Sequence, residues 1–380
     1  MRIRRLAALL LLAVPFGADA GASGESDRAS PSAAERERLD AVGAGLDYLW
    51  RSQNRDGSFG ETESVVGVTA LCMLAFFAAG HQEGRGRYGK YDLELGRGDV
   101  IRRGIAYLLA QSRSPSEKNP LVSTFPPYPP GYIVAENDAD SRMHGHCYAA
   151  QALLLAYGSG KQSDAWSSEL RRKVQLALQV IENAQTMTGG WGYDPTPDAS
   201  HEGSITVCAV QALRLATDAG FVVDKEVQRM GLRYLHDSQR PNGSFKYALM
   251  HERTSVALTA AAVTALHGFG EYYSESVRLG LEYLRNNYRR PDDVQPWYYY
   301  GNFYSAQAFY RAGGKDWERW CDAIVPSIVE RQERGAGPEA GSWDDRSNTD
   351  GPRSHGRVYA TAMSCLALSV PDGFLPLFQK

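Results

Sequence analysis

A turn signature recurs four times in this 380-residue chain and constrains its fold more than any other feature. In each copy an apolar residue is followed four positions later by Gln, and then by Gly, a small residue and an aromatic residue. The first copy reads Leu49, Gln53 and Gly57-Ser58-Phe59. The other copies contain Gln185 with Trp191, Gln239 with Phe245, and Gln332 with Trp343. A period of about 50 residues predicts one supersecondary unit that is built repeatedly.

Each signature separates two kinds of segment. The preceding segment is charged and amphipathic, and its apolar residues follow helical spacing, as Leu170, Val174 and Leu178 do. The following segment is rich in small apolar residues, which predicts a helix buried on all sides. We expect outer helices at residues 35–54, 98–112, 165–187, 222–240, 274–288 and 316–333. We expect inner helices at residues 64–80, 144–158, 203–216, 254–270, 299–314 and 356–369.

Six helical hairpins with their small-residue helices inside predict an all-α fold, a closed α/α toroid over residues 35–375. The alternative is an open helical solenoid. An open array would leave an apolar inner helix exposed at each end, so the pattern favours a closed ring.

The first twenty residues have the pattern of a secretory signal peptide. A basic start (MRIRR) precedes a short apolar run and a small-residue cleavage site, Ala18-Asp19-Ala20. Residues 21–34 have the composition of a flexible linker. We therefore predict an exported protein, periplasmic or secreted, with a single repeat domain at 35–375. The inner segments are too short and too rich in Ala and Gly to predict a membrane span.

Composition excludes some partners and indicates the state of the cysteines. The formal net charge of −3 argues against a nucleic-acid partner. Five cysteines are an odd number for an exported chain. Four of them lie in the inner segments, where cysteine packs as a small hydrophobic residue, so we expect buried free thiols at Cys72, Cys147, Cys208 and Cys365.

The four signatures resemble the QW-type motif of the prenyltransferase and squalene-oxidase repeat. The stretches RMHGHCYAAQALLLAYG, YYYGNFYSAQAFYRAGG and GRVYATAMSCLALSVPDGFLPLF are similar to those of exported bacterial members of that superfamily that have no assigned activity. The resemblance covers roughly residues 35–375 and implies the α/α toroid of terpenoid cyclases and protein prenyltransferase β-subunits.

The candidate site lies where the outer-to-inner connections meet. Chain order places these connections, most of them long, at one end of the toroid, and long loops on a rigid scaffold often carry function. Five of the eight histidines lie at this end, and we expect them to bind a ligand together with Trp297 and Tyr299: His144, His146, His201, His251 and His355. Carboxylates accompany them at Glu136, Asp138, Asp140, Asp194, Asp198, Glu202, Glu252, Asp344, Asp345 and Asp350.

A metal site is one interpretation of these histidines. In protein prenyltransferase β-subunits an Asp-x-Cys pair and a His at the starts of inner helices hold zinc. The resemblance implies His144, His146 and His355 as the corresponding ligands, although the residue types differ. The alternative is that the imidazoles cap helix ends or bond to loop backbone. We expect a shared cavity and no cofactor, with zinc at His144, His146 and His355 as the alternative.

Neither catalytic motif of the terpene cyclases is present. The nearest match to Asp-x-Asp-Asp is Asp138-Ala139-Asp140-Ser141, which lacks the last carboxylate, and Asp344-Asp345 is not followed by Asp at the spacing of Asp-Asp-x-x-Asp. Asp138 and Asp140 are therefore weak catalytic candidates. Sugar-active enzymes also use six-hairpin toroids with aromatic and acidic clefts, but no spacing here selects a carboxylate pair.

These observations predict an exported toroid that is non-catalytic or catalytically degenerate. It would be a scaffold that binds an apolar or isoprenoid-like small molecule, or an extracytoplasmic protein, at its loop-rich end. The alternative is an enzyme, either squalene-cyclase-like, metal-dependent or sugar-active.

Overall fold

Outer and inner helices alternate along the chain in the computed structural model. It describes residues 31–60, 64–90, 99–114, 128–136, 138, 142–159, 165–198, 200–288, 297–344 and 355–379. The outer helices are α1 (Ala33–Arg51), α3 (Val100–Ala110), α5 (Ala165–Asn183), α7 (Lys225–Ser238), α9 (Glu275–Asn287) and α11 (Gly314–Glu330). The inner helices are α2 (Val65–Ala78), α4 (Arg142–Ser159), α6 (Gly203–Asp218), α8 (Val256–Gly268), α10 (Tyr298–Ala312) and α12 (Gly356–Ser369). The all-α prediction is confirmed.

Short elements complete the described part of the chain. Two two-residue strands, β1 (Trp191–Gly192) and β2 (His201–Glu202), pair antiparallel before α6. Three 3₁₀ helices are η1 (Arg87–Gly89), η2 (Val370–Asp372) and η3 (Pro376–Phe378). The expected signal peptide and residues 21–30 of the expected linker lie outside the described residues. None of the described helices is both long enough and apolar enough to cross a membrane.

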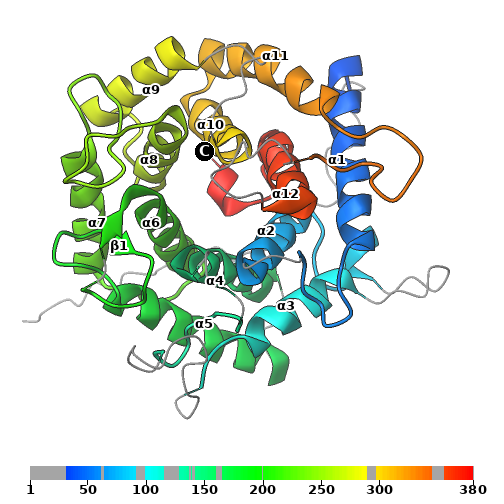
Figure 1. Ribbon diagram of the computed structural model, residues 1–380, viewed down its shortest axis with the longest axis horizontal. Helices are drawn as coiled ribbons and strands as arrows, with labels where there is room; N and C mark the ends of the chain where they lie inside the picture. Colours follow the sequence, from blue (N-terminus) through cyan, green and yellow to red (C-terminus); the bar gives the residue numbers. More distant parts are fainter. Residues whose placement is uncertain are drawn as a thin grey trace, which may run out of the picture. The chain divides into compact units, whose positions relative to one another are not determined.

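The inner helices form a closed ring, which the outer helices surround (Figure 1). Each inner helix packs against the next, and α12 packs against α2. In the outer layer α11 contacts α1. The closed toroid is therefore confirmed, because the first and last hairpins are neighbours.

The signature glutamine joins each of four hairpins to the next one in the ring. Gln185 Nε2 donates to the carbonyl of Gly189 in its own turn (2.9 Å) and to the carbonyl of Val227 in α7 (2.8 Å). The other three signature glutamines bond their own turns in the same way and reach the carbonyls of Val100, Ser276 and Ala41. The bond from Gln332 to Ala41 in α1 closes the ring.

The signature aromatic residues are fully buried and fix the turn on both sides. The Trp191 indole donates to the carbonyl of Ile181 in its own outer helix, and its backbone N–H donates to Thr206 in the next inner helix. Its ring also packs against the next outer helix, where a Cβ on Gly231 would lie 3.2 Å from it. Trp343 repeats this arrangement with Ile328, Thr361 and Gly45.

The first glycine of each signature is required by a close approach. Gly189 has φ +90°, and a Cβ there would lie 2.2 Å from the carbonyl oxygen of Met230 in α7. The corresponding glycines of the other turns meet the next outer helix in the same way, at 2.1–2.4 Å. A side chain at these positions would force the hairpins apart.

The ring consists of two similar halves, α1–α6 and α7–α12. The pattern Leu-x-Tyr-Leu-x-x-Ser-Gln-x-x-x-Gly-Ser-Phe occurs at 46–59 and again at 232–245. The pattern Gly-x-x-Tyr-x-Ala-Gln-Ala occurs in α4 at 145–152 and in α10 at 301–308. Each half thus contains a signature turn with Phe, then a connection without the signature, and then a signature turn with Trp.

All five cysteines are free thiols, which confirms the prediction for the four in the inner helices. Cys72, Cys147, Cys208 and Cys365 are buried in inner helices, and Cys321 in α11 is half-buried. Burial raises the pKa of the four inner thiols, so they pack as apolar groups.

Candidate functional site

The inner helices all begin at one end of the ring, which we call the mouth. At the start of α4, Arg142 has a φ of 35°, which is unusual for a residue with a side chain. Its Nη1 donates to Asp194 Oδ1 at 2.7 Å, and its guanidinium lies over the ring of Tyr193. This ion pair fixes the start of α4 against the loop between β1 and β2.

Glu202 is a buried carboxylate that caps α6. The pairing of β1 with β2 sets Glu202 opposite Trp191 and so holds it at the helix start. Its carboxylate accepts hydrogen bonds from the backbone N–H groups of Ser204 (2.9 Å) and Ile205 (2.6 Å), and the side chain is only 2% exposed. Burial raises its pKa, and the bonds from Ser204 oppose that rise.

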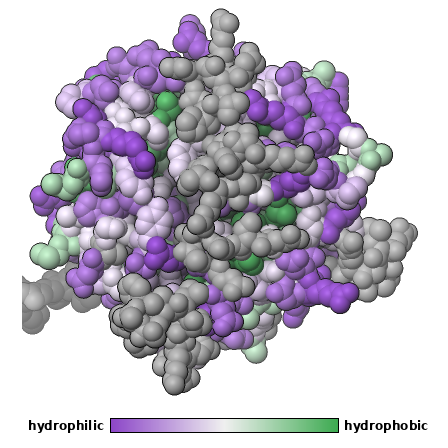
Figure 2. Space-filling view, in the orientation of Figure 1, coloured by the Kyte–Doolittle hydropathy of each residue, from purple (hydrophilic) through white to green (hydrophobic). Residues whose placement is uncertain are grey.

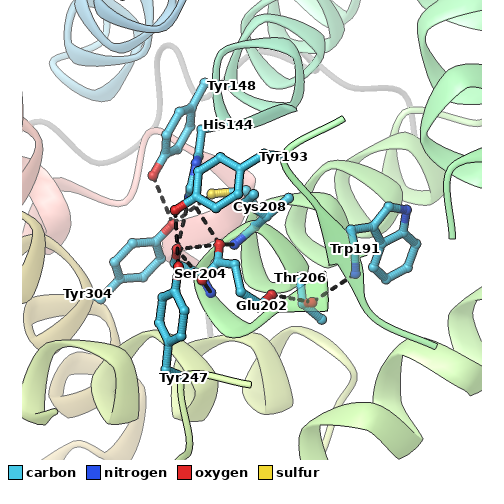
Figure 3. Close-up of polar contacts among 11 residues, drawn as sticks. His144, Tyr148, Trp191, Tyr193, Glu202, Ser204, Thr206, Cys208, Tyr247 and Tyr304 are labelled. Carbon is cyan, nitrogen blue, oxygen red and sulfur yellow. Dashed lines mark hydrogen bonds and ion pairs between the residues drawn. The ribbon is translucent and has the colours of Figure 1, made fainter. Parts of the chain in front are cut away.

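Ser204 connects Glu202 to His144 (Figure 3). Its Oγ lies 2.7 and 2.8 Å from the two carboxylate oxygens and 2.9 Å from Nε2 of His144 in α4. The His144 side chain is 19% exposed. Burial, with a smaller effect of the neighbouring His355, lowers its pKa to about 4. His144 is therefore a neutral imidazole at pH 7.

The direction of these hydrogen bonds fixes the tautomer of His144. An ionised carboxylate only accepts, so Ser204 donates to Glu202. The Ser204 oxygen then accepts from His144 Nε2–H, which leaves Nδ1 as the acceptor nitrogen of the ring. The half-buried side chain thus presents a neutral acceptor at the mouth.

Two tyrosine hydroxyls lie beside this group. Tyr193 follows β1, Tyr247 precedes α8, and their hydroxyl oxygens are 3.2 Å apart. The Tyr193 ring meets the His144 ring edge-on at 5.8 Å. Burial and then the Glu202 charge raise the pKa of Tyr193, so its hydroxyl stays protonated and can donate. The His144 imidazole and the two hydroxyls together form a polar cluster at the mouth.

The bore, meaning the space enclosed by the inner helices, is bridged by side chains below this cluster. Tyr148 in α4 and Tyr304 in α10 come from helices on opposite sides of the ring, and their hydroxyls meet at 3.2 Å. Tyr304 also donates to Gln211 Oε1 in α6 at 3.2 Å, and all three side chains are buried. The bridge separates the mouth from the deeper bore.

The other end of the bore is covered by the residues after α12, which lie inside the ring (Figure 1). Helix η3 contacts α6 and α10, and Phe378 is only 1% exposed. Arg311 Nη2 donates to the carbonyl of Leu377 at 2.7 Å. Down the ring axis, strongly hydrophobic residues show near the middle of the molecule, whereas most residues around its edge are hydrophilic (Figure 2).

The five predicted histidines fall into separate places. His146 is fully buried, accepts from the N–H of Ile133 at Nδ1, and lies 3.1 Å from the carbonyl of Ala177 at Nε2, so both nitrogens bind backbone. Burial lowers its pKa to about 4. His201 bonds to the Tyr234 hydroxyl and adjoins His251, which is exposed and meets the Tyr247 ring edge-on at 6.2 Å.

His355 lies at the start of α12, near enough to His144 to affect its pKa, and packs on Tyr359. The structure thus groups His144 with His355 at the mouth and places His146 elsewhere. Within the described ranges, no group of three His, Cys, Asp or Glu side chains is arranged to hold a metal ion. A zinc set of His144, His146 and His355 does not fit, because backbone groups occupy both nitrogens of His146.

The remaining candidates are spread along the mouth. Tyr299 is buried and donates to the carbonyl of Asp344, and Trp297 is 38% exposed just before α10. Asp138 is fully buried. Asp140 lies outside the described residues.

Sequence reasoning did not single out Ser204, Tyr193 or Tyr247. His144 and Ser204 are 60 positions apart, and no local motif signals their contact. The sequence does contain a feature that relates Tyr148 to Tyr304, because the two tyrosines occupy the same position of the pattern shared by α4 and α10.

No protein-family model matches this sequence, and no curated protein matches it significantly. Solved structures do match. The type II terpene cyclase MstE from Scytonema, with its substrate geranylgeranyl dihydroxybenzoate, has a TM-score of 0.55 at 12% identity, over 90% of this chain and 99% of that one. An α-amylase from Clostridium perfringens has a TM-score of 0.56 at 10% identity, over 90% and 99%.

An inactive variant of the α-1,6-mannanase GH76A of Salegentibacter, in complex with α-1,6-mannotriose, has a TM-score of 0.56 at 9% identity, over 89% and 100%. At these identities the matches establish the fold alone. The protein has the α/α-toroid fold that these structures share. The same architecture serves a cyclase and two carbohydrate-active enzymes in these structures, so the fold alone selects no function.

Proposed function

We propose that this protein is an exported toroid that binds a small, uncharged, hydroxyl-bearing ligand at its mouth. The observation that carries the proposal is the polar cluster of His144, Tyr193 and Tyr247. It offers an imidazole acceptor beside two hydroxyls that donate and accept. Export is supported by the pattern of residues 1–20 alone.

The interior of the ring favours a shallow site over a deep one. A long apolar ligand would need the space that Tyr148 and Tyr304 bridge. The charges nearest the cluster already have partners, because Arg142 pairs with Asp194 and Glu202 caps α6, and this favours an uncharged ligand. A hydroxylated ligand with an apolar face, such as a sugar or a terpenoid alcohol, suits both the rings and the polar groups.

Calorimetric titration of the full chain tests the proposal with three probes, which are α-1,6-mannotriose, the isoprenoid alcohol farnesol and the hydrocarbon squalene. We expect a hydroxylated probe to bind and squalene not to bind. His144→Ala or Tyr247→Phe should weaken binding about 5- to 10-fold, the effect of one lost hydrogen bond.

His236→Ala is the matched control, because His236 lies on the outer helix α7 and bonds to Glu271. Its affinity should equal that of the unmodified protein. Squalene binding as tight as farnesol binding, or unchanged affinity in both mouth variants, would refute the proposal.

A further inference from the structure

Ser204 differs from three serines that cap helices of this ring. Ser32, Ser255 and Ser274 each use the side-chain oxygen to cap a helix by accepting a backbone N–H. In α6 that task belongs to Glu202, which accepts the N–H groups of Ser204 and Ile205. The Ser204 hydroxyl is therefore not needed as a cap.

This hydroxyl lies instead between a carboxylate and an imidazole. Its oxygen is 2.7 Å from Glu202 Oε1 and 2.9 Å from His144 Nε2. Glu202 is almost completely buried, whereas Ser204 and His144 are half-buried and keep access to solvent. A hydroxyl held within hydrogen-bond distance of a base, with a second group fixing the geometry, is the arrangement of an activated nucleophile.

We propose that Ser204 is a nucleophile for acyl transfer, with Glu202 as its base and His144 as the donor that steadies its oxygen. The proposal rests on the proposed function, since the ligand must reach the same mouth. It narrows the ligand class to carboxylic esters of hydroxylated compounds.

The step balances without a cofactor. Ser204 Oγ attacks the ester carbonyl carbon while its proton passes to Glu202. The bond to the leaving alkoxide then breaks, and Glu202 returns the proton to that alkoxide, which leaves as an alcohol. Water repeats the sequence on the acyl-serine and releases a carboxylic acid.

Two features of the mouth favour this step. Burial raises the pKa of Glu202, which makes its carboxylate a stronger base than an exposed one. The Tyr193 hydroxyl remains a protonated donor near this carboxylate, and with the neighbouring Tyr247 hydroxyl it can stabilise negative charge on the carbonyl oxygen.

Covalent labelling of the full chain with a fluorophosphonate, followed by peptide mass spectrometry, tests the proposal. We expect one label, on Ser204, and a labelling rate that rises with pH as Glu202 loses its proton. Ser204→Ala should abolish labelling, and Glu202→Gln should slow it at least about 100-fold, the usual contribution of a general base. Ser255→Ala, another serine at the start of an inner helix, should label like the unmodified protein.

Glu202→Gln also alters the cap of α6, so thermal melts are needed to show that the variant is folded when its labelling rate is measured. His144→Ala leaves the cap intact and should still slow labelling at least tenfold. No label on Ser204, or a rate that neither variant changes, would overturn the proposal. If the hydroxylated probes still bind while Ser204 stays unlabelled, only the nucleophile is wrong. If Ser204 is labelled but no probe binds, the ligand assignment fails instead.

Discussion

The four signature turns and the two connections without the signature build the same ring by different means. Each signature turn uses a Gln, a Gly and a buried aromatic residue to join neighbouring hairpins. The connections into α4 and α10 lack these residues. Instead, His146 accepts the N–H of Ile133, and Asn302 at the same position of α10 accepts from the Tyr288 hydroxyl.

This difference shows where the ring is free to vary. The signature turns are constrained by contacts on both sides, so they repeat. The two divergent connections lead into opposite inner helices, and those helices carry His144, Tyr148 and Tyr304. The bridge across the bore thus comes from the helices that follow the divergent connections, whereas Glu202 and Ser204 at the mouth follow a signature turn.

The largest expected difference concerns tryptophan. Trp191→Ala, in a signature turn, removes a fully buried ring and should lower the free energy of unfolding by about 3–5 kcal/mol. Trp297→Ala, beside a divergent connection, removes a ring that is 38% exposed and should cost no more than about 1 kcal/mol. Urea denaturation measures both. Equal losses of unfolding free energy in the two variants would contradict the difference between signature turns and divergent connections.

The second test compares the two divergent connections. His146→Asn gives α4 the residue that α10 has at the same position, Asn302. Because the folded pKa of His146 is lowered to about 4, the unfolded chain binds more protons between about pH 4 and 6.5. The stability from this group therefore rises with pH across that window and is lost below it, by about 3 kcal/mol in total. Unfolding measured across the window should have a shallower pH dependence in His146→Asn. Asn302→Ala should lower stability equally at each pH, and a pH dependence identical in all three proteins would refute the assignment.

A smaller effect is expected for glutamine. Gln332→Ala removes two hydrogen bonds and leaves the carbonyls of Ala41 and Gly341 without them, which should cost about 1–3 kcal/mol. Gln111 at the end of α3 is the matched control from a divergent connection, and Gln111→Ala should stay within about 0.5 kcal/mol. Thermal melts of both variants decide the matter, and a loss in Gln111→Ala as large as in Gln332→Ala would show that the signature glutamine has no special role.

The smallest effect is expected in the bore. Tyr148→Phe and Tyr304→Phe each remove one hydroxyl from the bridge and should cost about 0.5–1.5 kcal/mol. The double variant should cost less than the sum, because the shared hydrogen bond is lost only once. Strict additivity in a double-mutant cycle would mean that the two hydroxyls do not interact.

The ring was predictable from the sequence because its determinants are local and repeated. The spacing from Gln to the aromatic residue marks where each outer helix ends, and the small-residue segments identify the inner layer. Each of the twelve expected helices is present, with boundaries that differ by only a few residues. The exact hydrogen bonds of Gln185 and its equivalents required the structure, since their acceptors lie on another hairpin.

The site was less predictable because its contacts join distant residues. His144 and His146 look equivalent in the sequence, yet they are two positions apart on a helix and face different surroundings. One bonds to Ser204 and the other to backbone. The role of Ser204 depends on Glu202 having taken over the capping of α6, which no local pattern reveals.

The closure of the ring between Gln332 and Ala41 has a consequence for how the protein folds. The two residues are 291 positions apart, so the last seam cannot form until almost the whole chain is available. Joining such distant segments is slow, because the entropy of a long loop must be lost before the contact forms. Until then the faces of α1 and α2 that pack against α11 and α12 stay open to water. We expect this partly wound intermediate to be the species most prone to aggregation during refolding.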